Sequence, residues 1–338
     1  MENLLQFKSF AEMLQKLPND NACREHLEQI HWNGTPICAF CFSDKSYKLT
    51  TKGVFSGLYK CGNCKMRYNV ATSTMFEGSH IGYQKWFIAM YIMQSHKKGI
   101  SSYQLARDLG ISQKASWFML HRIRNAMKER GGEKLEGRIE LDETFVGGKN
   151  KNRHSDKKVE KSQGRSFKDK VPVLGILREA EKETIYRPHK KNPLLTVKEI
   201  IYKTQAFVRC VVVRDTKAQT LQPFVYCNVK EGSTIISDEW YAYRGLERHY
   251  DHKVVDHKAK NYVTSEGDTS NALEGFWTWF KKTWSATYHK MSRKHLQAYA
   301  NEIAFRYNFH RMKEVDRFSM LLGMTGCRLS YKMLVGRT

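Results

Sequence analysis

The sequence predicts a multidomain chain, in which a zinc ribbon and a helix-turn-helix precede an α/β domain with a mixed five-stranded sheet flanked by helices. Three observations predict this order: two C-x2-C pairs near the start, a glycine-separated helix pair after them, and short apolar strands followed by helical segments. The predicted segments are N-terminal helices over 1–31, the zinc ribbon over 32–78, the helix-turn-helix over 79–132, the α/β domain over 136–312 and a C-terminal tail over 313–338.

The composition predicts a folded protein with a polyanionic partner. Lys and Arg number 57 against 34 Asp and Glu in 338 residues, which gives a formal net charge of +23. Hydrophobic residues make up 41% of the chain and aromatic residues 12%, which excludes a disordered basic tail. The chain has neither a signal-peptide core nor an apolar run of about 20 residues, so we expect a cytoplasmic protein with no membrane partner.

The first 31 residues are expected to form two short helices. Phe7, Phe10 and Leu14 recur at helical spacing, and the run Leu17-Pro18-Asn19-Asp20 ends the first helix and starts the second.

Four cysteines predict the zinc site. Cys38 and Cys41 form one C-x2-C pair, and Cys61 and Cys64 form another after nineteen intervening residues. Two such turns supply four thiolates that can close tetrahedrally around one Zn²⁺. Because the site would be four-coordinate and closed, we expect a structural zinc. Four reduced cysteines buried at this spacing by chance are the weaker alternative.

The segment from Ile100 to Ser112 predicts a helix, a turn at Gly110 and a new helix start. Ser102 is expected to cap the first helix and Ser112 the second, which runs from Gln113 to Lys128. In a helix-turn-helix the second helix enters the major groove. A plain helical pair without contact to DNA is the alternative. The residues of the second helix expected to face DNA are Gln113, Lys114, Ser116, Arg122 and Arg124.

The α/β domain is expected to begin with strands and end with helices. The predicted strands are 138–145, 171–178, 207–214, 233–237 and 253–256, and the predicted helices are 220–229, 271–284 and 294–312. Residues 149–170 read as a flexible basic loop, either solvated or in contact with phosphate. Residues 179–203 are longer and more basic than a hairpin needs, and no function is assigned to them.

Three acidic residues stand out in this domain. Asp142 lies within a predicted strand, Asp238 ends another, and Glu274 lies in a predicted helix. Three such carboxylates can converge at one end of a sheet and bind two divalent cations, which suits in-line displacement at phosphorus and the ligand preference of Mg²⁺. Each acid taken alone is more often a cap or a surface group. Lys281, seven residues after Glu274, returns to the same helix face and can steer a phosphate or pair with the glutamate.

Further motifs carry a resemblance to a known family. The order of zinc ribbon and helix-turn-helix, followed by Leu141-Asp142-Glu143-Thr144-Phe145-Val146-Gly147-Gly148-Lys149, resembles bacterial insertion-sequence transposases with an N-terminal zinc ribbon. The other matching residues are Ser237-Asp238-Glu239, Tyr241-Ala242-Tyr243, Asn271-Ala272-Leu273-Glu274-Gly275-Phe276-Trp277, Tyr288-His289, Lys294-His295-Leu296, Tyr299, Glu302 and Phe305-Arg306-Tyr307-Asn308.

The resemblance implies a ribonuclease-H-like (integrase-like) catalytic core with an acidic triad, carried here onto Asp142, Asp238 and Glu274. Relatives vary at the third acid, so Asn271 competes with Glu274, and we favour Glu274 because a carboxylate is the better Mg²⁺ ligand. Mg²⁺ or Mn²⁺ is expected as two ions at the triad. Lys281 and His289 are candidate phosphate contacts.

The implied activity is that of an insertion-sequence DNA transposase. It would bind terminal inverted repeats, cleave strands with a metal-activated water, and join the freed 3′-hydroxyl to target DNA. Two alternatives stay open: a ribonuclease-H-like nuclease that does not join strands, and a non-catalytic DNA-binding regulator. The expected partner is double-stranded DNA, with a homo-oligomer when DNA is bound and a location at the bacterial nucleoid.

Overall fold

The computed structural model describes residues 6–147, 154–158, 170–189, 192–255 and 271–336. The chain divides into two compact units: unit 1 comprises 1–128 with 309–338, and unit 2 comprises 129–308. Most of the predicted basic loop over 149–170 lies outside the described residues. No helix in the described ranges is long and apolar enough to cross a membrane.

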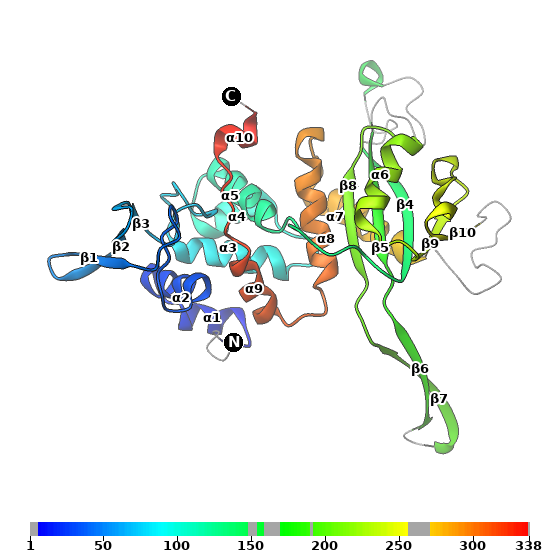
Figure 1. The fold of residues 1–338 in the computed structure, drawn as a ribbon, viewed down its shortest axis with the longest axis horizontal. Coiled ribbons are helices and arrows are strands. Elements are labelled where there is room, and N and C mark those ends of the chain that lie inside the picture. Colours follow the sequence, from blue (N-terminus) through cyan, green and yellow to red (C-terminus); the bar gives the residue numbers. More distant parts are fainter. Residues whose placement is uncertain (1–5, 148–153, 159–169, 190–191, 256–270, 337–338) are drawn as a thin grey trace. The chain divides into compact units, whose positions relative to one another are not determined.

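Unit 1 combines the N-terminal helices, a small sheet and the helix pair (Figure 1). Its elements before the helix pair are α1 (Phe10–Lys16), α2 (Asp20–Trp32), β1 (Ser46–Thr51), β2 (Val54–Cys61), β3 (Arg67–Tyr68) and α3 (Tyr83–Ser95). The three strands form one antiparallel sheet in the order β1-β2-β3. The two N-terminal helices and the strand-rich ribbon predicted from the sequence are therefore present.

The last residues of the chain fold onto unit 1. Helix α9 (Glu314–Gly323) is followed by α10 (Tyr331–Val335), where the sequence predicts only a tail over 313–338. Phe318 of α9 is fully buried and its ring contacts those of Phe7, Phe87 and Tyr91. Residues from both ends of the chain thus share one aromatic core, and a prediction based on neighbouring residues could not detect this contact.

The helix pair consists of α4 (Ser102–Leu109) and α5 (Gln113–Ala126). Gly110 ends α4 in the left-handed region at φ +59°, and Ser112 accepts a hydrogen bond from the backbone N–H of Ala115 at 3.2 Å, as a helix N-cap does. The cap of α4 is Ser101, which accepts from Gln104 N at 3.1 Å, so the prediction of Ser102 as the cap is wrong by one residue.

Unit 2 contains the predicted mixed five-stranded sheet. Its strands are β4 (Arg138–Val146), β5 (Val171–Arg178), β8 (Phe207–Val212), β9 (Thr234–Asp238) and β10 (Asp251–Val255), in the order β10-β9-β4-β5-β8. Strands β4, β5 and β8 pair antiparallel, and β9 and β10 run parallel to β4. All five predicted strands are confirmed, with ends displaced by no more than two residues.

Helices cover both faces of this sheet (Figure 1). On one face α6 (Ala218–Asn228) packs through Leu221 and Val225 against Ile139 and Leu141 of β4. On the other face α7 (Asn271–Thr283) and α8 (Leu296–Asn308) pack against β5 and β8. Because successive side chains of a strand point to opposite faces, Asp142 lies on the same face of β4 as the α7–α8 layer.

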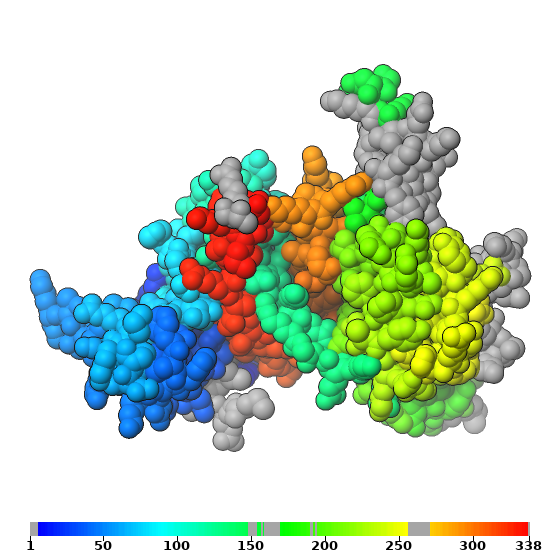
Figure 2. Space-filling view, turned by 45° about the horizontal axis from the view of Figure 1, so that its top comes forward, coloured from blue at the N-terminus to red at the C-terminus, as the bar shows by residue number. Residues whose placement is uncertain are grey.

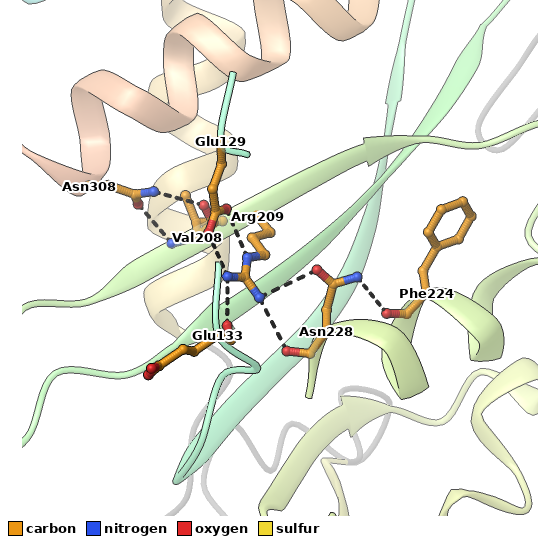
Figure 3. A network of polar contacts seen from close by, with 7 residues as sticks. All are labelled: Glu129, Glu133, Val208, Arg209, Phe224, Asn228 and Asn308. Carbon is orange, nitrogen blue, oxygen red and sulfur yellow. Dashed lines mark hydrogen bonds and ion pairs between the residues drawn. The ribbon is translucent and has the colours of Figure 1, made fainter. Parts of the chain in front are cut away.

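Side chains cover the free edge of β8. Asn308 of α8 accepts from Val208 N at 2.7 Å and donates to Val208 O at 3.0 Å (Figure 3). Gln297 makes the same pair of contacts with Val212 N and Cys210 O. The guanidinium of Arg209 lies among Glu129, Glu133 and Asn228 in the same network (Figure 3). The edge of the sheet is therefore closed to pairing with another strand.

A separate two-stranded ribbon leaves the sheet between β5 and β8. Strand β6 (Lys182–His189) pairs antiparallel with β7 (Asn192–Tyr202), and neither strand belongs to the five-stranded sheet. In Figure 1 the ribbon extends away from the rest of unit 2. It accounts for the length of 179–203, which the sequence analysis left unassigned.

Candidate active site and zinc centre

The four predicted zinc ligands meet at one point of the small sheet. Cys38 and Cys41 lie before β1, Cys61 ends β2 and Cys64 follows it, and their four Sγ atoms all lie within 4.8 Å of one another. Cys38 Sγ is 3.6 Å from Cys64 Sγ, and Cys41 Sγ is 3.5 Å from Cys61 Sγ. Four thiolates at about 2.3 Å from one Zn²⁺ stand roughly 3.8 Å apart, so this donor set fits tetrahedral zinc.

The apolar core around the cysteines is small. Its buried residues are Cys38, Tyr59, Cys61 and Tyr68, with Trp32 packed edge-on against both tyrosine rings. The backbone N–H of Asn63 donates to Cys61 Sγ at 3.3 Å, a bond that holds a metal-binding thiolate in place. So little apolar area is a weak source of folding free energy, and the geometry fits a structural zinc.

Asp142 and Asp238 are brought side by side by the parallel pairing of β4 and β9. Leu141 pairs with Ser237, so the next residue on each strand is one of the two aspartates. Asp142 Oδ1 accepts from Glu143 N at 2.8 Å, and Asp238 Oδ1 accepts from Trp240 N at 3.0 Å. A spacing of 96 residues in the sequence thus becomes a neighbour pair at one end of the sheet.

The pKa of Asp142 responds to the charges of both other predicted acids. The pKa of Asp142 is raised to about 6, first by burial and then by the charges of Asp238 and Glu274, while the hydrogen bond from Glu143 N lowers it. Like charges gathered in a half-buried place favour a bound cation. The ligand atoms of the three carboxylates do not all lie within 4.8 Å of one another. Among the described residues, the four cysteines are the sole group of three or more possible metal ligands that meets this distance.

Glu274 lies on the exposed side of α7, whose opposite side is anchored to the sheet. Leu273, Phe276 and Phe280 are buried against β5 and β8. Gly175, the partner of Asp142 across β4 and β5, permits this approach, because a Cβ there would stand 2.6 Å from the Trp277 ring. The buried indole N–H of Trp277, whose ring lies near Asp142, makes no hydrogen bond of good geometry.

Glu140 is a site residue that the sequence analysis treated as an ordinary acid. It is 1% exposed on β4, two residues before Asp142, and its carboxyl accepts from Leu273 N at 2.7 Å and Ala272 N at 3.3 Å. These two N–H groups belong to the first turn of α7 and have no partner within the helix. Glu140 therefore fixes the start of the helix that carries Glu274. Its sequence signal was its position two residues before Asp142, which puts both acids on the same face of the strand.

Removing Glu140 should loosen the start of α7. In Glu140→Ala we expect faster amide exchange at Ala272 and Leu273 and a loss of about 2 kcal/mol of stability, because two buried donors lose their acceptor. Glu140→Gln keeps an acceptor oxygen and should retain most of the protection. Hydrogen exchange read by mass spectrometry checks this, and equal protection in the alanine variant would contradict the anchoring role.

The burial of three residues on α5 corrects the prediction of which side chains face DNA. Ser116, Arg122 and Arg124 are 0%, 6% and 1% exposed, so the expectation that they face DNA is wrong. The guanidinium of Arg122 donates to Met75 O at 2.9 Å and Leu329 O at 3.0 Å, and it ties α5 to segments that the sequence could not place beside it. Gln113 is partly exposed and Lys114 is exposed, so both remain candidates.

The three supporting residues of the catalytic prediction are all exposed. Asn271 and Lys281 lie at the two ends of α7, and His289 follows it with a left-handed backbone at φ +52°. The adjacent Tyr288 donates to the buried Glu302, which also pairs with Arg306 at 3.1 Å. Tyr288 is therefore engaged in packing, while the other three side chains are accessible to a ligand.

Comparison with known proteins identifies the family. The model of an "ISXO2-like transposase domain" matches residues 134–308, which is more than half of the chain. The chain belongs to this family of insertion-sequence transposases. A "transposase zinc-ribbon domain" matches residues 18–67, which contain the four cysteines of the zinc centre.

One curated relative comes from an archaeal mobile element. It is described as an "Uncharacterized protein in transposable element ISH50" of Halobacterium salinarum and is 29% identical over 154 residues. The match covers 44% of this chain and 51% of the relative, so the chain spans about half the length of that protein. The matches together show a chain of this transposase family with an N-terminal zinc-ribbon domain.

Proposed function

We propose that this transposase binds the terminal inverted repeats of its element and catalyses divalent-metal-dependent DNA cleavage and strand transfer. Asp142, Asp238 and Glu274 are proposed as the metal ligands. The observation that carries the proposal is the parallel register of β4 and β9, which sets Asp142 beside Asp238 on the face covered by the helix that bears Glu274.

The fold of unit 2 is proposed to be ribonuclease-H-like. Its support is the sheet itself: three antiparallel strands in chain order, then two strands parallel to the first, with helices on both faces. In such a sheet the acids of the first and fourth strands meet at one end. The helix-turn-helix role of α4 and α5 is likewise a proposal, supported by the Gly110 turn, the two serine caps and the exposed Lys114.

Each residue of the candidate site has its own proposed role in the reaction. Asp142 and Asp238 offer adjacent carboxylates, and Glu274 offers a third from the exposed side of α7. Two Mg²⁺ or Mn²⁺ ions bound there supply activation of a nucleophile and stabilisation of the leaving oxygen. Glu140 holds α7 at its start, and Lys281 of the same helix is proposed to contact a phosphate. Cleavage by water and attack by a 3′-hydroxyl are both in-line displacements, so one site serves both.

The test uses the purified full chain and DNA that carries the inverted-repeat ends of its element. Incubation with Mg²⁺ or Mn²⁺ should yield nicked strands and products joined to a second DNA. Nicks without joined strands would support a nuclease, and binding without either product would support a regulator.

The zinc ribbon is proposed as a DNA contact in its own right. Residues 36–68 hold six Lys or Arg and one Asp, and the β1–β2 turn stands out from unit 1 (Figures 1 and 2). Phe42 is 80% exposed and Phe40 is 48% exposed beside the cysteines. Basic side chains neutralise phosphates, and exposed aromatic rings stack on bases or wedge between them.

The backbone conformation of Phe42 allows one substitution to distinguish a role of this residue in DNA binding from a role in folding. Its φ is +58°, a left-handed conformation that glycine adopts more readily than phenylalanine. Phe42→Gly should therefore stabilise the ribbon by about 1 kcal/mol while weakening DNA binding by about tenfold, the effect of losing one stacked base. Thermal unfolding and fluorescence anisotropy measure the two effects.

Lys65 provides the matched control. It follows Cys64 as Phe42 follows Cys41, and it also has a left-handed backbone, at φ +65°. Lys65→Gly should give the same relief of strain and lower only the salt dependence of binding. An unchanged DNA affinity in Phe42→Gly would argue against stacking by this ring.

A further inference from the structure

Helix α5, proposed above to contact DNA, is exposed only at its start. All of its residues are described, and none after Lys114 is exposed. The side-chain amide of Gln113 donates to Ser102 Oγ at 2.9 Å, so that amide is held by α4. Lys114 is therefore the one exposed side chain of the helix that is expected to read DNA. The face that continues from Lys114 along the helix lies under residues 328–335, named here the terminal segment.

The terminal segment packs on one stripe of α5. Lys114, Phe118 and Arg122 follow one another at intervals of four residues, so they share a face of the helix. The guanidinium of Arg122 donates to Leu329 O at 3.0 Å. The ring of Phe118 meets the ring of Tyr331 edge-on, with centroids 5.4 Å apart, and Lys114 Nζ lies 5.2 Å from the centroid of the same tyrosine. A DNA duplex that approaches this face of α5 thus meets the terminal segment first.

The terminal segment is folded where it lies. Ser330 caps α10 by accepting from Met333 N at 3.2 Å, and Leu334 of that helix is buried. On the same short helix Lys332 is exposed, and Met333 is 66% exposed (Figure 1). Side chains of α10 therefore form the outer surface over this stripe of α5.

The charge of the terminal segment favours contact with DNA over an inhibitory role. Residues 317–338 contain no Asp or Glu and include Arg328 and Lys332. Arg328 pairs with Glu77 at 3.0 Å, while Lys332 has no acid partner among the described residues. A segment that keeps DNA away from a basic helix is expected to carry acids in place of the phosphates. This segment instead adds positive charge to the helix that it covers, and positive charge attracts the DNA backbone.

We propose that α10 and the start of α5 together form one DNA-contacting surface, in which Lys332 and Lys114 meet the phosphates of the same duplex. This role rests on the DNA binding proposed above and assigns the contact to α5 and the terminal segment together. The two lysines are far apart in the sequence, but the ring of Tyr331, the residue before Lys332, lies beside Lys114.

The test measures binding of a duplex that carries the inverted-repeat ends, by fluorescence anisotropy with the full-length, zinc-loaded protein and no added Mg²⁺ or Mn²⁺. We expect Lys332→Ala to bind about five- to tenfold more weakly at about 0.1 M salt, because one phosphate contact is lost. The slope of log K against log salt should become smaller by about one. Lys16→Ala removes the same charge from an exposed position on α1 and should bind as the wild type does. Thermal unfolding and zinc content should match in all three, because both lysines are exposed.

A truncated chain that ends after Ser330 removes α10 and keeps Leu329 O as the acceptor for Arg122. It should bind at least about tenfold more weakly. If the truncation unfolds unit 1, Lys332→Ala alone decides the question.

Three results would overturn the proposal. Tighter binding by the truncated chain would make the terminal segment an inhibitory cover of α5. Unchanged binding by Lys332→Ala would remove α10 from the interface, and an equal loss in Lys16→Ala would reduce the effect to net charge. Each of these leaves DNA binding by the wild type intact, whereas a wild type that does not bind the duplex would contradict the proposed function as well. Binding is read without cleavage, so the result is independent of the proposed metal site.

Discussion

Asp142→Asn should abolish DNA cleavage and at the same time stabilise the metal-free protein. Loss of one of the proposed metal-binding carboxylates is expected to lower the rate of strand cleavage at least about a thousandfold, which corresponds to roughly 4 kcal/mol of transition-state stabilisation. The residue lies far from the zinc ribbon in the sequence, so zinc content should stay at that of the wild type. Gel analysis of nicked and joined products, with zinc content measured on the same preparation, checks both statements.

The stability gain follows from the sign of the pKa shift. The pKa of Asp142 is raised to about 6, so its contribution to stability is complete below its unfolded-state pKa and is lost as the pH rises through about 6. Above that pH the folded protein holds a poorly solvated charge beside Asp238. Asparagine removes the charge, and we expect a gain of roughly 1–3 kcal/mol at pH 7.5 and little change at pH 4. Added Mg²⁺ should stabilise the wild type more than the variant.

The matched control is Glu239→Gln, which removes an exposed charge one residue after Asp238. It should retain cleavage and show no comparable gain in stability. An inactive and destabilised Asp142→Asn would mean misfolding and leave the proposed role without support. An active one would contradict the proposed triad directly, because no step could then depend on that carboxylate.

Local sequence patterns predicted the elements that carry the candidate site. Alternation of apolar residues located the strands that bear Asp142 and Asp238, and helical spacing located α7. Spacing alone could not predict that Leu141 pairs with Ser237, because the register of two strands so far apart depends on the whole sheet. The role of Glu140 depends on the same sheet, since its partners lie more than 130 residues away.

Predictions failed where long-range packing overrides local pattern. Arg122 and Arg124 have the composition of a DNA-reading helix, yet both are buried, and Arg122 bonds to Met75 and Leu329. Helix α9, near the end of the chain, supplies Phe318 to the same unit, and no residue close to it in the sequence indicates that contact. The prediction of the four-cysteine site succeeded for the opposite reason. Such a metal site is specified by short spacings in the sequence, and its geometry follows from coordination chemistry.

Removing zinc should unfold the ribbon and leave the sheet of unit 2 intact. Structural zinc in small modules contributes about 10–16 kcal/mol, while the buried core here comprises two tyrosines and two of the ligands themselves. Cys61→Ser should therefore abolish zinc binding, expose residues 36–68 to protease and weaken DNA affinity. The five-stranded sheet of unit 2 and the helices packed on it should resist digestion, because that unit has two apolar cores of its own. Zinc content and limited proteolysis provide the measurements.

Cys227→Ser is the control, because Cys227 is an exposed free cysteine outside the cluster. It should bind one zinc per chain and keep the wild-type digestion pattern. One equivalent of zinc in Cys61→Ser would contradict the four-cysteine centre. If the ribbon unfolds while unit 2 still cleaves DNA without sequence preference, zinc serves recognition and the carboxylates serve catalysis. If cleavage is lost as well, the ribbon must deliver the DNA end to the site, since Asp142, Asp238 and Glu274 all lie in the other unit.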